Sequence, residues 1–336
     1  MAKKERSVPA LQDVARKAGV GAATVSRVIN GGLNVSPATF AAVTAAIREL
    51  GYHPNHAARS LKGAKTKTIG LVIPSVADPF FSSAAAAIED VARTRETLVL
   101  LATSNNDPQH EREQMSTLIQ RRIDGLILVP SAATDQSLFE QAGFPTICLD
   151  RPIKGTPVST VLGDNHAGAR AATQHLVDHG YRRILCLGGD PLLFTSKRRF
   201  QGHREVIHKA GLPYLADFNV QDYASAEAAV RAHLKAKSGV DAIFTTKNST
   251  TVFVYKILRS LGLSIPGDVA VLGYDDFELA DALDPPISVI RQPVRQLATT
   301  AAELLFEQMD RGTGGQGLIT LDVELVLRQS CGCGRQ

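Results

Sequence analysis

The twelve residues Gly19–Asn30, GVGAATVSRVIN, predict a short helix with a single apolar face. Val25, Val28 and Ile29 share that face at helical spacing, and we expect them in a core. The opposite face carries two alanines and three polar residues: Ala22, Ala23, Thr24, Ser26 and Arg27. Because these side chains are small or polar, the helix backbone can approach another surface closely.

Two further helices are predicted around this stretch. Residues 11–18 place apolar side chains at helical spacing, and Gly19 follows where a sharp turn needs positive φ. A third helix begins at Ser36, a capping residue followed by proline, and ends at Gly51. Its expected packing residues are Phe40, Val43, Ile47 and Leu50. Three short helices with a glycine turn between the first two indicate a helix-turn-helix domain, whose second helix faces the major groove of DNA.

The beginning of the chain is much more basic than the rest. Residues 1–67 contain eleven Lys and Arg against three Asp and Glu, whereas the remainder contains 26 against 30. A basic segment joined to a mildly acidic body indicates a polyanionic partner for that segment. On charge alone a solvated basic tail is the alternative, and the helical pattern favours the first interpretation.

Composition excludes several classes of protein. The chain has 336 residues, 44% of them hydrophobic, enough for two or three compact units. We find neither an apolar run long enough to cross a bilayer nor an export signal. The four cysteines are too few and too scattered for a disulfide framework. We therefore expect a soluble, cytoplasmic protein without a membrane partner.

The predicted second helix suits contact with base edges. Arg27 can bond guanine or a phosphate, whereas Ala22 and Ala23 can at most contact a thymine methyl group. Residues 52–68, YHPNHAARSLKGAKTKT, then contain a helical stretch too short to be stable alone. Two interpretations stay open for it: a flexible basic linker, or a helix that forms on DNA and inserts Leu61 between base pairs from the minor groove.

Three ordered motifs give the first part of the chain a family resemblance. They are D-V-A-x-x-A-G-V from Asp13, T-V-S-R-V-I-N from Thr24, and G-Y-x-P-N-x-x-A-R-x-L from Gly51. This region resembles the DNA-binding headpiece of the LacI/GalR family of bacterial transcription regulators. The resemblance implies operator contacts from Thr24, Ser26, Arg27 and Asn30 in the headpiece, and an intercalating role for Leu61 in a hinge helix. Ala22, Ala23, Asn55, His56 and Ala58 are further candidate DNA contacts.

The chain departs from the family pattern at three positions of the headpiece. Gly21 stands where the family usually has serine, and Ala22 and Ala23 stand where it has larger polar residues. The resemblance therefore does not specify which bases these positions prefer.

From Thr68 onward, apolar runs alternate with helical stretches. Seven runs are strand-like: residues 68–74, 97–103, 124–130, 145–150, 183–190, 241–246 and 269–276. They are continuous instead of alternating, which predicts strands buried on both faces. Strands that alternate with helices form parallel sheets covered on two sides, and a break near residues 162–164 divides them into two lobes.

The predicted fold is therefore a small all-α helix-turn-helix domain followed by a two-lobed α/β core of parallel sheets. The core resembles the effector-binding core of the same family, which is similar to periplasmic sugar-binding proteins with three crossovers between lobes. We expect five segments: a headpiece over 1–53, a hinge helix and linker over 54–67, a first lobe over 68–163 and 292–328, a second lobe over 164–291, and a tail over 329–336.

Ligands bind outside the carboxyl ends of strands in open parallel sheets. The polar or aromatic residues that follow the predicted strands are Asp78, Phe80, Phe81, Asp150, Arg151, Lys247, Asn248 and Asp275. Any one of them alone is better explained as an ordinary loop residue, but convergence from two lobes favours a cleft. The family resemblance places Phe80, Asp150, Arg199, Tyr223, Asp275 and Gln292 around a ligand. Such a set offers donors and acceptors to vicinal hydroxyls and rings to a sugar face.

Lys247 departs from the family pattern, which usually has Asn-Asp after this strand where this chain has Lys247-Asn248. With Arg199 and Arg151 nearby, the added positive charge predicts an effector that carries a carboxylate or phosphate, such as a sugar acid. The alternative is that Lys247 turns away and pairs with Asp275 or Asp276. Both interpretations stay open.

The last cysteines, Cys331 and Cys333, are one residue apart. Without a partner histidine or cysteine run they make a poor zinc site, so we expect a frayed tail. The nine histidines show no ligand spacing, and we find no nucleophile–base–acid set. We therefore predict no metal, cofactor or catalytic residues.

Taken together, these patterns predict a sequence-specific DNA-binding regulator, most often a repressor in the resembling family, whose operator affinity a sugar-like effector controls. We expect a homodimer on a pseudo-palindromic duplex, because no leucine heptad follows residues 326–330 to build a tetramer.

Two rival classes are a solute-binding protein without a DNA role, which the basic headpiece disfavours, and a sugar-processing enzyme. The sequence leaves open whether the effector releases DNA or holds it.

Overall fold

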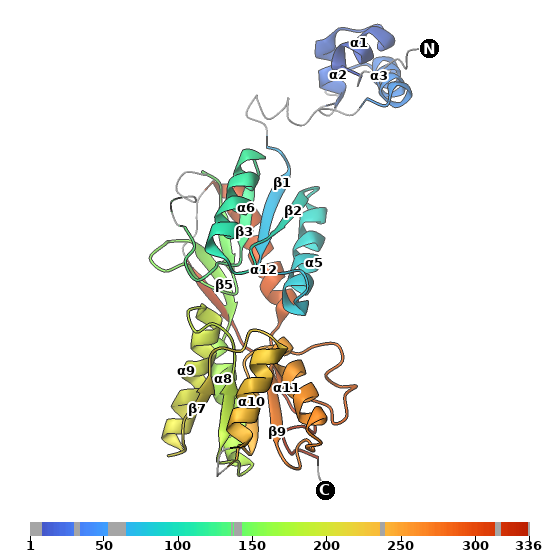
Figure 1. Cartoon of the computed structure of the whole chain (residues 1–336). Helices are drawn as coiled ribbons and strands as arrows, with labels where there is room; N and C mark the ends of the chain where they lie inside the picture. Colours follow the sequence, from blue (N-terminus) through green and yellow to red (C-terminus); the bar gives the residue numbers. More distant parts are fainter. Residues whose placement is uncertain are drawn as a thin grey trace, which may run out of the picture. The chain divides into compact units, whose positions relative to one another are not determined.

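The computed structural model describes residues 9–29, 34–52, 65–135, 137, 143–235, 239–312 and 317–334. The chain forms two compact units, Met1–Thr66 and Lys67–Gln336. The first is a headpiece of short helices, and the second is an α/β core made of two lobes (Figure 1).

The headpiece contains the three predicted helices, α1 (Leu11–Ala18), α2 (Ala22–Ile29) and α3 (Pro37–Leu50). Gly19 ends α1 with a φ of 68°, the left-handed conformation that turns the chain sharply into α2. Ser36 caps α3, since its Oγ accepts the N–H of Thr39 at 3.2 Å. The headpiece core is formed by Val14, Ala15, Val25, Val28, Val43, Ala46 and Tyr52.

This core confirms the predicted burial of Val25 and Val28, but the prediction for Phe40 is wrong. Phe40 is 45% exposed. The buried side of α3 is centred between Val43 and Ala46, and Phe40 lies about a quarter turn away from that centre at roughly 100° per residue.

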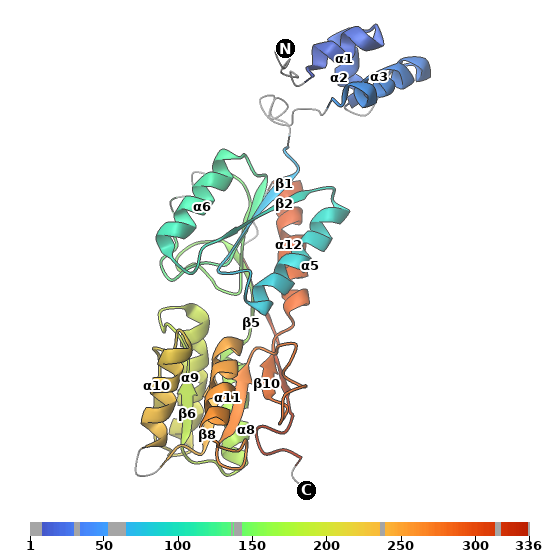
Figure 2. The same ribbon diagram turned by 45° about the vertical axis from the view of Figure 1, so that its right-hand side comes forward.

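The first lobe is a six-stranded sheet in the order β11-β5-β4-β3-β1-β2, with every pair parallel. Its strands are β1 (Thr68–Ile73), β2 (Leu98–Thr103), β3 (Gly125–Leu128), β4 (Thr146–Leu149), β5 (Ser159–Gly163) and β11 (Leu318–Leu321). Helices α5 (Pro79–Thr94) and α12 (Val294–Arg311) pack on one face, and α6 (Pro108–Gln120) covers the other (Figure 2).

The second lobe is a six-stranded sheet in the order β12-β10-β9-β8-β6-β7. Its strands are β6 (Ile184–Leu187), β7 (Leu215–Asp217), β8 (Ala242–Thr245), β9 (Ala270–Tyr274), β10 (Ser288–Arg291) and β12 (Glu324–Val326). Helices α8 (Asn165–Asp178) and α9 (Phe194–Lys209) pack on one face, and α10 (Tyr223–Leu234) and α11 (Asn248–Ser260) on the other. All pairs are parallel except β10 with β12.

The two lobes therefore repeat one arrangement, and the chain passes between them three times. The passages follow β5, β10 and β11. The third corrects the expected lobe boundary, since residues 292–328 do not all belong to the first lobe. β11 joins the first sheet, but β12, which begins two residues further on after Asp322 and Val323, pairs with β10 in the second.

Two expectations about burial are also wrong. β2 is not buried on both faces, because it lies at an edge of the first sheet and leaves Leu98 and Leu101 61% and 44% exposed. The C-terminal segment is not frayed through residue 334. Cys331 is fully buried, and the Oγ of Ser330 donates to the Val271 carbonyl at 2.6 Å and accepts the Ser288 N–H at 2.8 Å. These bonds attach the segment to the second sheet.

In the described part of the chain, no helix combines the length and the apolar character needed to span a membrane.

His203 is a buried titratable side chain between the helices of the second lobe. Its ring lies on α9, is fully buried near Phe244, and places Nδ1 3.1 Å from the Thr173 hydroxyl on α8. Burial lowers the pKa of His203 to about 3. The ring is therefore neutral in the folded protein throughout the range in which an exposed histidine becomes charged.

This burial predicts that the protein loses stability in mild acid. The unfolded chain takes up a proton at His203 near pH 6.5, and the folded chain does so only near pH 3, so the free energy of unfolding falls as pH falls through this window. Between pH 8 and pH 5 the loss from this side chain is about 2 kcal/mol. Urea unfolding followed by circular dichroism should show this loss in the wild type and in the exposed control His208→Gln on the same helix. His203→Gln should lack it, and an equal loss in His203→Gln would contradict the assignment.

Candidate functional site

A cavity of about 850 Å³ lies between the two lobes, where the carboxyl ends of the strands of both sheets meet. Its polar and aromatic lining from the first lobe includes Asp78, Phe80, Phe81, Asn106, Asp150 and Arg151. From the second lobe come Asp190, Arg199, Lys247, Asn248, Asp275 and Glu278, and Gln292 lies where the chain passes between the lobes. The predicted convergence of strand ends on a cleft is confirmed.

One aspartate from each lobe occupies an equivalent position in this cavity. Asp150 follows β4 and Asp275 follows β9, the strands that correspond in the two sheet orders. Both have a φ of 69°, and each donates its N–H to the next strand, Asp150 to Val161 O at 2.8 Å and Asp275 to Ile290 O at 2.9 Å. Aspartate tolerates this left-handed conformation better than most residues. The turn directs the chain out of the sheet at the edge of the cavity.

Asp275 is held by a guanidinium from α9. Arg199 Nη1 lies 3.1 Å from Asp275 Oδ2 and donates to the Thr246 carbonyl at 2.6 Å, while its Nε donates to Asn165 Oδ1 at 2.7 Å. The guanidinium carbon lies 3.7 Å from the centre of the Tyr274 ring. Arg199 thus connects α9 with α8 and with the turns after β8 and β9, and these bonds hold the second-lobe wall of the cavity in place.

Asp150 has a corresponding partner in the first lobe. Arg151 Nε donates to Asp150 Oδ2 at 3.2 Å, and its Nη1 donates to Asn106 Oδ1 at 2.6 Å and to the Pro130 carbonyl at 3.1 Å. Both side chains of the pair are at most 7% exposed. Each lobe therefore presents one carboxylate–guanidinium pair, at most 12% exposed, to the cavity.

The two carboxylates influence each other electrostatically across the cavity. Burial raises the pKa of Asp150, Arg151 and Arg199 lower it, and the charge of Asp275 raises it; the net shift is upward. Burial likewise raises the pKa of Asp275, against the opposing effects of Arg199 and Gln292. The Gln292 amide contributes by donating to Asp275 Oδ1 at 2.6 Å. Keeping these carboxylates charged away from water costs free energy. A ligand that donates hydrogen bonds to their oxygens would reduce that cost.

A hydrogen bond joins the two lobes at one edge of the cavity. Asn248 Nδ2 at the start of α11 donates to Asp78 Oδ1 at 3.2 Å. Asp78 caps α5, accepting the N–H of Phe80 at 3.0 Å. The bond therefore connects the N-terminal end of α5 in the first lobe with the N-terminal end of α11 in the second.

Lys247 lines the cavity, and the alternative pairing considered from the sequence is not found. Among the described residues, its ammonium group makes no ion pair. Asp275 pairs with Arg199, and Asp276 pairs with Arg291 and Arg328. The described lining nevertheless contains five carboxylates against three cations, so the cavity as a whole is not positively charged.

The structure does not bring Tyr223 to the cavity, and that prediction is wrong. Tyr223 begins α10, is 37% exposed, and packs edge-on against Phe253 of α11 at 6.1 Å. Val220 and Gln221, just before the helix, line the cavity instead. Sequence reasoning also missed Asn106 and Asp190, although both follow strands and the same strand-end rule could have found them.

The predicted DNA-contacting residues of the headpiece lie on the outer side of α2. Ala22, Ala23 and Arg27 are exposed, and Thr24 and Ser26 are half-buried. The remaining predicted contacts lie outside the described residues: Asn30, Asn55, His56, Ala58 and Leu61.

Comparison with known families covers both units of the chain. Residues 10–55 match the model for bacterial regulatory proteins of the lacI family, and residues 66–326 match the model for periplasmic binding proteins and the sugar-binding domain of the LacI family. The chain belongs to the LacI family. The resemblance inferred from the sequence is therefore confirmed, as is the predicted fold class.

Several LacI-family proteins are similar along nearly the whole chain. The regulator CelR of Thermobifida fusca is 36% identical, over 97% of this chain and 99% of its own, and the ribose operon repressor of Escherichia coli K12 is 36% identical over 95% and 99%. Among solved structures, a CelR–cellobiose complex has a TM-score of 0.73 at 34% identity, covering 96% and 99%. A lac repressor dimer bound to operator and an anti-inducer has a TM-score of 0.85 at 26% identity, covering 97% and 99%.

The geometry of the second-lobe pair predicts strong energetic coupling between Arg199 and Asp275. Arg199→Ala leaves a buried carboxylate without its cation and should lower the free energy of unfolding by about 3 kcal/mol. Urea unfolding should show that Arg199→Ala/Asp275→Ala costs less than the sum of the two single changes. Lys197→Ala, at an exposed position of the same helix, should stay within about 0.5 kcal/mol of wild type. Additive single effects would contradict the pairing.

Proposed function

We propose that this chain is a transcription regulator that binds operator DNA through α2 and whose operator affinity is set by a neutral, hydroxyl-rich effector in the interlobe cavity. The observation that carries the proposal is the pair of equivalent aspartates, Asp150 and Asp275, one from each lobe, on a single cavity. A ligand that hydrogen-bonds to the carboxylates of both aspartates contacts both lobes at once. Its binding is therefore coupled to how the lobes are arranged.

The chemistry of the lining favours a neutral sugar over a sugar acid. Arg151 and Arg199 are each already neutralised by an aspartate, and the described lining has more carboxylates than cations. Hydroxyl groups can donate to the aspartates and accept from the guanidinium groups. The buried ring of Phe80 offers an apolar surface to the C–H groups of a sugar. A cavity of about 850 Å³ suits a mono- or disaccharide, and the relative CelR is known as a complex with cellobiose.

We propose that the cavity binds its ligand without transforming it. A carboxyl group that acts as general acid or base must reach the reacting atoms with a free proton site. Asp150 and Asp275 are instead each bonded to a guanidinium, and Asp275 is also bonded to Gln292. This bonding favours recognition of hydroxyl groups over proton transfer.

The headpiece supplies features that suit a duplex. Arg27 is exposed on α2, and the neighbouring alanines leave room for the helix backbone to approach base edges. The excess of Lys and Arg in residues 1–67 would neutralise phosphates and displace their counterions. We propose that the protein works in the cytoplasm, where bacterial chromosomal DNA lies.

We propose a homodimer on a pseudo-palindromic operator. The exposed Leu98 and Leu101 on the edge strand β2 give the first lobe apolar surface that pairing with a second chain would bury. Two headpieces brought together in this way would contact two half-sites about one DNA turn apart.

The function can be tested by measuring DNA binding with and without sugars. Duplexes selected from a random pool on the wild-type protein should bind with an affinity that falls steeply with salt. A neutral mono- or disaccharide should change that affinity by about 5- to 150-fold in fluorescence anisotropy. Arg27→Ala should weaken duplex binding by a similar factor while leaving sugar binding in calorimetry unchanged. Failure to select any duplex would favour a solute-binding protein without a DNA role.

Lys247→Asn distinguishes a neutral effector from an anionic one. If the effector is neutral, Lys247→Asn should change its affinity by less than about threefold, because the asparagine amide can still donate a hydrogen bond to a hydroxyl group. If the effector carries a carboxylate or phosphate, the loss should be at least about tenfold. Isothermal titration calorimetry of both proteins with the sugar found above gives the answer, and a tenfold loss would replace the neutral effector with an anionic one.

A further inference from the structure

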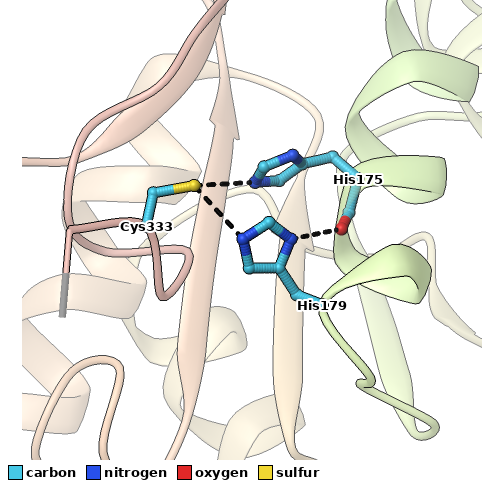
Figure 3. A group of neighbouring side chains, drawn as sticks. All are labelled: His175, His179 and Cys333. Atoms are coloured by element: carbon cyan, nitrogen blue, oxygen red, sulfur yellow. Dashed lines mark hydrogen bonds between the residues drawn. The ribbon is translucent and has the colours of Figure 1, made fainter. Parts of the chain in front are cut away.

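A second cluster of chemically active side chains lies away from the cavity, where the C-terminal segment meets α8. Figure 3 shows His175, His179 and Cys333 directed toward one another. His175 and His179 are one helical turn apart, at the end of α8 and just beyond it, and Cys333 approaches from the other side. Cys331 joins the same cluster from a fully buried position.

Three sulfur–nitrogen pairs in this cluster are in close contact. His175 Nε2 is 3.2 Å from Cys331 Sγ and 3.5 Å from Cys333 Sγ, and His179 Nε2 is 3.2 Å from Cys333 Sγ. The ligand atoms of His175, His179 and Cys333 all lie within 4.8 Å of one another. All four cysteines of the chain have free thiols.

The three sulfur–nitrogen separations are close to those between ligands of a tetrahedral zinc ion. With Zn–S near 2.3 Å and Zn–N near 2.05 Å, tetrahedral angles place sulfur and nitrogen ligands about 3.5 Å apart. The observed S···N distances are 3.2–3.5 Å. An ion bound by these side chains would keep the three sulfur–nitrogen separations near the distances found here.

The backbone of the C-terminal segment is shaped to present both sulfurs. Gly332, between the cysteines, has a φ of 98°, in a region that residues with a Cβ rarely adopt. A Cβ there would also lie 2.9 Å from the Tyr181 hydroxyl. The segment is anchored just before it by the buried Ser330, so the Cys-Gly-Cys turn is held against the second lobe.

Neighbouring groups orient the ligand atoms as in known metal sites. His179 Nδ1 lies 3.0 Å from the His175 carbonyl, and donation there leaves Nε2 without a proton and facing Cys333. The Ser288 hydroxyl donates to Cys331 Sγ at 3.0 Å. The N–H of Cys333 donates to the same sulfur. Donors of this kind stabilise a metal-bound thiolate.

We propose that Cys331, Cys333, His175 and His179 form a Cys₂His₂ site for one Zn²⁺ ion per chain. Four protein ligands leave no open position, which is the arrangement of a structural zinc site. The ion would fasten the end of the chain to α8. The first residue of that helix, Asn165, holds Arg199 at the cavity, so the site would also steady the second-lobe wall.

The sequence prediction missed this site for an identifiable reason. His175 and His179 have the i, i+4 spacing that places two ligands on one helical face. The partner cysteines lie more than 150 residues away in the chain. Neither half is a strong zinc motif alone, and only the packing of the C-terminal segment brings them together.

Zinc content and spectroscopy of the full chain test the proposal. Reduced protein, stripped with chelator and given equimolar Zn²⁺, should retain about one zinc per chain after desalting. Co²⁺ in its place should give a thiolate-to-cobalt charge-transfer band and the intense visible bands of a tetrahedral site. Cys333→Ser and His179→Ala are at partly or fully exposed positions, so both variants should fold by circular dichroism. Loss of a hydrogen-bond partner of a metal ligand lowers metal affinity by about 10- to 100-fold. Because each of these variants removes a ligand itself, its zinc affinity should fall by a larger factor.

His208→Gln is the matched control, because it removes an exposed histidine of the same lobe outside the cluster. It should retain zinc as wild type does, and zinc should raise the melting temperature of both. Three results would overturn the proposal: wild-type protein that retains no zinc, ligand variants that retain as much as wild type, or reduced protein whose Co²⁺ complex lacks the thiolate band.

Discussion

The binding of a buried carboxylate to a buried guanidinium, once in each lobe, is the interaction on which the cavity depends. Removing two charges from water costs free energy that their attraction does not fully return, so such pairs contribute little net stability. Their main effect is to fix the positions of the elements that they connect. Arg199 joins α8, α9 and the turns after β8 and β9, while Arg151 joins the turns after β2, β3 and β4. The result is a rigid wall in each lobe that presents hydrogen-bonding groups in a fixed arrangement, which is the property a selective sugar site needs.

The connection between the lobes explains how occupancy of this cavity can have distant effects. The chain passes between the lobes at three places, and Gln292 lies in one of them while bonded to Asp275. A ligand bound to Asp275 therefore lies next to one of the chain segments that connect the two lobes. The bond from Asn248 to Asp78 forms only when the lobes approach each other at that edge. A ligand can shift the arrangement of the lobes only by the difference between its affinities for the two arrangements, and contacts with both lobes supply such a difference.

The sequence predicted most of the fold because its patterns are local. The glycine turn at Gly19, the cap at Ser36 and the continuous apolar strands each follow from a few neighbouring residues. The strand-end rule located Asp150 and Asp275 because chain direction alone decides which end of a parallel strand meets the cleft.

The failures have the opposite character, because each depends on packing between distant segments. Tyr223 is near the cavity along the chain, but the helix that it begins directs its ring toward Phe253. β12 pairs with β10 in the second sheet, although β11 just before it belongs to the first. The cysteines at the end of the chain looked isolated until α8 placed two histidines beside them.

We propose that ligand in the cavity and DNA on the headpiece bind to one coupled molecule. Linkage requires that coupling to be reciprocal, so the factor by which the sugar changes operator affinity must equal the factor by which operator changes sugar affinity. The most direct measurement is calorimetry of the sugar with the free protein and with the protein saturated by its selected duplex. The two sugar dissociation constants should differ by the same factor that is found in the DNA-binding experiment. Equal sugar dissociation constants with and without the duplex would contradict the proposal.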